Sequence, residues 1–273
     1  MLGPEEYIAY CGMAAIQGML VLLPRPPVSR GWSRFRSPAW ALVLPAALMV
    51  GTFGVRDVPH GATDLAVLAA VVTPVLVVIA AIGVVRGPRW AWLAALPLLG
   101  AGVALHSWPA QLSATALTAL GCLTLGAALV RLTPLPWLAA GIVAMCIVDA
   151  VLLGAGLGQP AAHQLEAALR HSSLPEFHRA QLGSMNRDYP DLVLAAVLGA
   201  ALAGHARQAT AAVLAAGLSC ANGLFFLVAD MLPATVPLGV AAAAIFVLER
   251  RRGKTRGPVA RPQRPVAVQP MEA

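Results

Sequence analysis

The chain has 273 residues, of which 59% are hydrophobic and 11% charged, whereas a soluble domain carries about 25% charged residues. Because the apolar residues cover almost the whole length, this composition excludes a soluble domain with one anchor and indicates a polytopic membrane protein. The net charge of +7 comes mainly from basic clusters beside apolar runs, which are typical of cytoplasmic flanks rather than of a nucleic-acid-binding surface.

Nine apolar runs follow one another along the chain, each close to the roughly 20 residues that a helix needs to cross a bilayer. They predict an all-α membrane protein with nine transmembrane helices in one domain, residues 1–252. The basic segment 253–273 has no periodicity and is predicted to be a disordered tail. The expected spans are residues 7–24, 38–55, 64–85, 90–107, 110–130, 134–157, 185–204, 208–228 and 231–248.

The basic residues predict the orientation. With nine spans and the N-terminus outside, 15 of the 19 Lys and Arg fall in inside loops or in the C-terminal tail. This asymmetry predicts a plasma-membrane protein with its C-terminus in the cytoplasm. The composition, rich in Ala, Arg and Pro, is typical of a bacterial protein. Glu5 and Glu6 precede the first apolar run, so that run is expected to be a span rather than a signal peptide.

The cysteines are scattered, and each lies inside an apolar run without a CxxC pair. We expect small buried side chains and neither a zinc site nor a disulfide framework. No phosphate-binding glycine loop or His-Glu-x-x-His motif is present in the sequence, and we expect no metal and no cofactor. The four positions are Cys11, Cys122, Cys146 and Cys220.

Two aspartates interrupt or border apolar runs. Asp149 lies well inside the sixth run, where a charge costs about 2.5–3.5 kcal/mol on insertion scales. Asp191 precedes an apolar stretch, residues 192–203, that is only about 18 Å long as a helix, against a hydrocarbon core of about 30 Å. The seventh span is therefore expected to begin near Met185, which draws Asp191 into the membrane.

On this count both aspartates lie at similar depths, roughly 12 Å for Asp149 and roughly 9 Å for Asp191. Carboxyl groups that meet inside a membrane would share a proton and titrate as a pair. One could then activate water while the other protonates a peptide carbonyl, as in aspartic proteases. The alternative is a non-catalytic role, in which the aspartates relay protons or ions in a transporter or join helices.

Three segments resemble motifs of presenilin- and signal-peptide-peptidase-type intramembrane aspartyl proteases of the Gly-x-Gly-Asp class. Asp149 follows Val148 where that family has a Tyr-Asp motif, and Asp191 ends "DYPD" where it has Gly-x-Gly-Asp. "LPATVPLG", residues 232–239, opens the ninth run where the family has Pro-Ala-Leu. The order of segments matches over most of the chain. The chain departs from the family pattern in all three motifs, so an inactive relative is the second alternative.

The resemblance implies an intramembrane endopeptidase with Asp149 and Asp191 as catalytic residues. It also implies that residues 233–235 bind an unwound substrate, and its substrates would be single transmembrane segments within lipid. Asp188 and Tyr189 are auxiliary candidates in the same motif. With the N-terminus outside, the orientation resembles that of signal peptide peptidases. The substrate, the oligomeric state and any need for accessory subunits stay open. The proposed binding residues are Pro233, Ala234 and Thr235.

Overall fold

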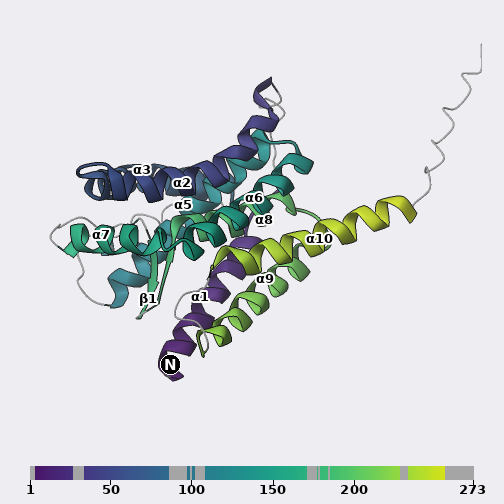
Figure 1. Ribbon diagram of the computed structural model, residues 1–273. Coiled ribbons are helices and arrows are strands. Elements are labelled where there is room, and N and C mark those ends of the chain that lie inside the picture. The colour runs from purple at the N-terminus through teal and green to yellow at the C-terminus, as the bar shows by residue number, and fades with distance from the viewer. Residues whose placement is uncertain are drawn as a thin grey trace, which may run out of the picture.

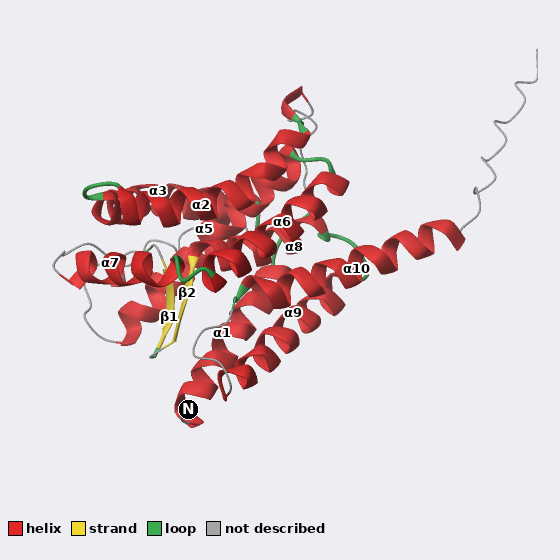
Figure 2. Cartoon of the chain, in the orientation of Figure 1, coloured by secondary structure: helices red, strands yellow, loops and turns green. Residues whose placement is uncertain are grey.

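The computed structural model describes residues 4–26, 34–85, 97–98, 100–101, 108–170, 177, 179–183, 185–227 and 233–255. Within these residues the fold is all-α apart from one β-hairpin, as Figures 1 and 2 show. The helices are α1 (Pro4–Leu22), α2 (Val43–Asp57, after the 3₁₀ helix η2, Pro38–Leu42), α3 (Gly61–Gly83), α5 (Trp108–Leu132), α6 (Leu135–Gly154), α7 (Gly158–Arg170), α8 (Tyr189–Ala201), α9 (Gln208–Asn222, before η4, Gly223–Leu227) and α10 (Thr235–Thr255). The hairpin strands are β1 (Arg179–Leu182) and β2 (Met185–Asp188).

Five described helical segments are long and apolar enough to cross a membrane: Pro38–Asp57, Gly61–Gly83, Trp108–Leu132, Leu135–Gly154 and Gln208–Phe225. α8 and the apolar part of α10, Thr235–Leu248, are apolar but shorter. The span in α3 is only 22% buried by the protein, so most of its apolar surface is left for lipid. These features support a multi-span membrane protein. Most of the expected fourth span, 90–107, lies outside the described residues.

α8 is the central helix of the bundle, and it corrects the expected seventh span. All its residues from Leu194 to Ala201 are buried, with α1, α2, α5, α9 and α10 packed around it (Figure 1). A helix covered by protein on every side is apolar all round and need not match the bilayer thickness. Residues 185–188, expected to extend this helix, form β2 instead. Pro190 lies in the first turn of α8, where its missing N–H costs nothing, and marks the start of the helix.

The hairpin is short and antiparallel (Figure 2). Its register pairs Arg179 with Asp188 and Leu182 with Met185, and Gly183 in the turn has a positive φ of 60°. This left-handed conformation is one that glycine adopts without steric cost.

α10 continues to Thr255, so it includes residues 253–255, which were expected to belong to the tail. The rest of the expected tail, 256–273, lies outside the described residues.

The bundle has one end, here called the Gln208 end, where loops are joined by backbone and side-chain hydrogen bonds. Arg25 N–H donates to the Val84 carbonyl at 2.9 Å. Gln208, 3% exposed, donates from Nε2 to the carbonyl oxygens of Val21, Leu22 and Pro24 at 3.0, 3.1 and 3.3 Å. Gln208 thereby satisfies carbonyl groups at the C-terminus of α1 that no helical N–H can reach.

Gln208→Leu is therefore expected to lower the free energy of unfolding by about 1–3 kcal/mol, because buried carbonyls lose their donor. Gln17→Leu is the matched control. Gln17 is also fully buried, but neither of its side-chain polar atoms has a partner among the described residues. Its replacement should be neutral or stabilising. Denaturant unfolding in detergent measures both variants, and equal losses would contradict the assigned role of Gln208.

At the opposite end, here called the disulfide end, the structure corrects the expectation for the cysteines. Cys11 of α1 and Cys220 of α9 form a disulfide with a Cα–Cα distance of 5.0 Å. Cys122 is a free buried thiol and Cys146 is free and half-buried. The pairing was not visible in the sequence because 209 residues separate the two cysteines and only the packing of α1 against α9 brings them together.

Candidate aspartate site

Asp149 and Thr235 are joined by a short hydrogen bond between two helices. Asp149 lies in the last turns of α6, and Thr235 is the first residue of α10. Thr235 Oγ1 donates to Asp149 Oδ2 at 2.6 Å. The Thr235 residue is fully buried, whereas Asp149 is half-buried. Thr235 therefore supplies a hydrogen-bond donor to one of the two aspartates.

Cys146 reinforces this junction one helical turn before Asp149. Its Sγ donates to the Thr235 carbonyl oxygen at 3.3 Å. A Cβ added to Gly239, one turn beyond Thr235, would lie 2.5 Å from the same sulfur atom. α6 and α10 thus pass closely at Cys146 and Gly239. This crossing sets the distance between Asp149, one turn after Cys146 in α6, and Thr235, one turn before Gly239 in α10.

Gly239→Ala is expected to separate α6 from α10 and weaken the Asp149–Thr235 hydrogen bond. The added methyl group meets the Cys146 sulfur, and overpacking of this kind costs about 1–3 kcal/mol. The double variant Cys146→Ala/Gly239→Ala should recover most of the loss, because removing the sulfur makes room for the methyl group. Thermal unfolding of the two single variants and the double variant gives their coupling energy, and additive losses would contradict the close crossing.

Asp191 lies in the first turn of α8 and is half-buried. The charges of Asp149 and Asp188 both repel the ionised Asp191 carboxylate, while the Arg187 guanidinium attracts it. The two carboxylates of Asp149 and Asp191 therefore lie within electrostatic reach of each other, although no hydrogen bond joins them. The site gathers charged and polar groups from α6, β2, α8 and α10.

The two auxiliary candidates, Asp188 and Tyr189, lie in different surroundings. Asp188 is exposed and precedes α8 without capping it through its side chain. Tyr189 turns toward α3 and α5. Its hydroxyl lies 3.3 Å from Thr73 Oγ1 and fills a notch at Gly121, which would hold no Cβ. Tyr189 thus helps to hold the start of α8 against those helices, away from Asp149.

Pro233 and Ala234 are half-buried in the turn that leads into α10, next to Thr235. The structure therefore brings Asp149, Asp191 and Thr235 into one region, with Pro233 and Ala234 beside it through the chain. Sequence reasoning missed Cys146 and Arg187. Cys146 stands three residues before Asp149, a spacing that places two side chains on one helix face, so that signal was available.

No sequence spacing pointed to a role for Arg187 at the site, and it was predicted only as a basic residue of an outside loop. It is 7% exposed, and its guanidinium carbon lies 4.6 Å from the centre of the Tyr10 ring. Its Nη2 is buried without a hydrogen-bond partner among the described residues. A buried cation stacked on an aromatic ring, four residues before Asp191, compensates part of the negative charge at the site.

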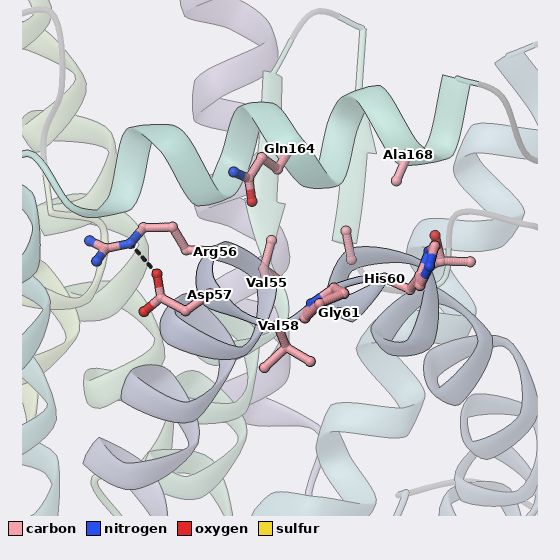
Figure 3. A pocket seen from close by; sticks show the side chains of 11 residues that line it. Val55, Arg56, Asp57, Val58, His60, Gly61, Gln164 and Ala168 are labelled. Atoms are coloured by element: carbon pink, nitrogen blue, oxygen red, sulfur yellow. Dashed lines mark hydrogen bonds and ion pairs between the residues drawn. The ribbon is translucent and has the colours of Figure 1, made fainter.

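An open cavity of about 440 Å³ lies elsewhere, between the α2–α3 turn and α7 (Figure 3). Gln164 and Ala168 of α7 face residues 56–61, which comprise the end of α2, the turn and the start of α3, across it. Arg56 Nε and Asp57 Oδ1 form an ion pair at 2.7 Å, and both side chains are partly exposed. Such a pair contributes little to stability. None of the predicted catalytic or binding residues lines this cavity.

Comparison of the chain with protein-family models, with curated proteins and with solved structures finds no match. Among the described residues, no three His, Cys, Asp or Glu side chains gather in a way that could hold a metal ion.

Proposed function

We propose that the protein is an intramembrane aspartyl protease that hydrolyses peptide bonds of transmembrane segments with Asp149 and Asp191. One observation supports this proposal above the others. Asp149 of α6 bonds to Thr235 at the start of α10, while Asp191 at the start of α8 lies within electrostatic reach. Residues distant in sequence that resemble three motifs of one protease class thus lie around one site.

The chemistry needs two carboxyl groups that share one proton. The ionised carboxylate takes a proton from water as the water oxygen attacks the peptide carbonyl, and the protonated carboxyl group donates its proton to the carbonyl oxygen. The Thr235 hydroxyl, which donates to Asp149 Oδ2, fixes one oxygen of that carboxyl group as an acceptor.

The hairpin offers a place for an extended substrate. Thr115 of α5 accepts from Gln181 N–H and donates to the Gln181 carbonyl, both at 2.8 Å, so α5 occupies the outer edge of β1. In an antiparallel pair the opposite residue, Asn186, then directs its own N–H and C=O to the other edge. Among the described residues no further backbone hydrogen bond reaches this edge of β2. A substrate strand added there would run toward Asp191.

The proposal includes the orientation of the protein in the membrane. The N-terminus outside and the C-terminus in the bacterial cytoplasm would give a preference for substrate spans whose N-termini lie inside. The Cys11–Cys220 disulfide supports this orientation, because disulfides persist on the oxidising side of a membrane. A C-terminal reporter that fluoresces only outside should stay dark, and a bright signal would contradict the orientation.

The test uses the purified full chain in liposomes with a panel of single-span substrates in both orientations. Wild type and the double variant Asp149→Asn/Asp191→Asn are compared, and products are mapped by mass spectrometry. Wild-type cleavage inside the span, absent in the double variant, supports the proposal. Equal cleavage by both proteins contradicts it. No cleavage, together with ion uptake that depends on the two aspartates, would favour the relay role instead.

A further inference from the structure

The Cys11–Cys220 disulfide joins two helices at the end of the bundle that holds the hairpin. Cys11 lies in the second turn of α1, and Cys220 lies in the last turn of α9. Both residues are half-buried, so neither is sealed inside the core as the free Cys122 is. The hydroxyl oxygen of Tyr7 lies 3.7 Å from Cys220 Sγ. The disulfide is thus in a position that a thiol reagent can reach after modest movement of the helix ends.

Tyr10, next to Cys11, is the contact point of three elements. Asn222, two residues after Cys220, donates from Nδ2 to the Tyr10 hydroxyl oxygen at 3.4 Å. The Tyr10 ring packs so closely on Gly223 that an added Cβ would lie 2.5 Å from a ring carbon. The guanidinium of Arg187 stacks on the same ring. The disulfide therefore stabilises the packing of α1 against the end of α9, on which Arg187 of β2 also rests.

Two connections lead from this contact to the aspartate site. Arg187 is four residues before Asp191, and its charge attracts the Asp191 carboxylate. α9 also packs directly against α10, whose first residue, Thr235, donates to Asp149. Loss of the α1–α9 link would therefore loosen the supports of both aspartates at once.

We propose that Cys11–Cys220 is a redox latch: the disulfide keeps the aspartate site assembled, and its reduction to two thiols releases the end of α9 and Arg187. The effect on proteolysis rests on the proposed function, whereas the effect on local order does not. The partner is a dithiol–disulfide protein on the oxidising side of the membrane. In the reduction, a thiolate of the partner attacks one sulfur of the Cys11–Cys220 bond, which forms a mixed disulfide and releases one thiol of this chain. The partner's second thiol then displaces the other sulfur, so one disulfide of this chain becomes two thiols while two thiols of the partner become one disulfide. The reverse exchange with the partner's disulfide closes the latch again.

The redox state is measured first, without any assay of activity. Membranes are denatured and labelled with a maleimide-polyethylene glycol that adds a fixed mass to each free thiol. Wild type should show two additions without reductant, at Cys122 and Cys146, and four after reduction. Cys11→Ser should show three without reductant, because Cys220 becomes free. Four additions to unreduced wild type would overturn the latch.

The second measurement is hydrogen exchange of the purified full chain with and without dithiothreitol. Reduction should speed exchange by about tenfold or more in β2 and at the end of α9, a modest share of what a native disulfide contributes. The core of α5 should not change. Reoxidation should restore protection, and Cys11→Ser/Cys220→Ser should not respond to dithiothreitol. Unchanged exchange in wild type would overturn the proposal whether or not a cleaved substrate has been found.

With a cleaved substrate in hand, dithiothreitol should reduce wild-type cleavage and reoxidation should restore it. Cys11→Ser/Cys220→Ser is the matched control, since it lacks the latch and keeps the free thiols of Cys122 and Cys146. Its cleavage rate should not respond to dithiothreitol. A response as large as that of wild type in this control would assign the redox effect to the free thiols and overturn the latch.

Discussion

Asp149→Asn and Asp191→Asn are each expected to slow cleavage of a transmembrane substrate by at least about 10³-fold, as for single members of other catalytic groups. Asparagine keeps the size of the side chain but cannot exchange a proton with water or with a peptide carbonyl. Asp149→Asn should still accept the hydrogen bond from Thr235 through its amide oxygen, so the fold is expected to persist. Initial cleavage rates in liposomes, normalised to folded protein, measure the effect.

Asp64→Asn provides the control. Asp64 is an exposed carboxylate in the first turn of α3 and has no contact with the aspartate site. Its replacement should leave the cleavage rate within about twofold of wild type, as for most surface substitutions. Cleavage by either site variant at the rate of Asp64→Asn would remove the catalytic assignment. The double variant should be no slower than the slower single variant, because the two carboxyl groups act as a unit.

Much of the helical architecture could be predicted from hydrophobic runs, because helices in lipid must satisfy their own backbone and therefore need long apolar stretches. The runs 38–55, 64–85, 110–130 and 134–157 correspond to helices that are long and apolar enough to span a membrane. The seventh run was misread for a physical reason. The length argument assumed lipid on all sides of α8, whereas protein covers that helix.

The hairpin escaped prediction because its strands are four residues each and polar, with no alternation that stands out from a loop. Its stability comes from tertiary contacts, namely Thr115 and Thr118 of α5 bonding to β1 and Tyr10 of α1 stacking under Arg187. Such contacts join residues far apart in the chain, and short-range patterns in the sequence carry no trace of them.

The candidate site, too, could be predicted from the sequence only in part. Asp149 and Asp191 stand out in the sequence because charge is costly in an apolar run. Thr235 was expected to lie at a substrate-binding turn, and its hydrogen bond to Asp149 adds a role that spacing could not reveal. Arg187 entered the sequence prediction only as a positive charge in a loop. Its burial at 7% exposure is a property of the packed hairpin and of α1, so no local sequence pattern separates it from surface arginines.

The central position of α8 leads to the largest expected effect on stability. Gly199 of α8 faces the backbone of α1, and an added Cβ would lie 2.6 Å from the carbonyl oxygens of Leu20 and Val21. Backbone atoms cannot rotate away as a flexible side chain can, so Gly199→Ala must push α1 off the central helix. Overpacking typically costs about 1–3 kcal/mol, and a clash with backbone should reach the upper end of that range or exceed it.

Gly217→Ala is the matched control for this prediction. Gly217 lies inside α9, also a helix of the bundle, but an added Cβ there meets nothing within 4 Å. The same substitution should therefore be neutral or stabilise the protein by up to about 1 kcal/mol through helix propensity. The two variants are compared by thermal unfolding in detergent, which is monitored as the loss of monodisperse protein. Because each adds one methyl group to a helical glycine, a difference between them reports the contact of α8 with α1. Equal melting temperatures would mean that α1 does not pack on α8 at Gly199.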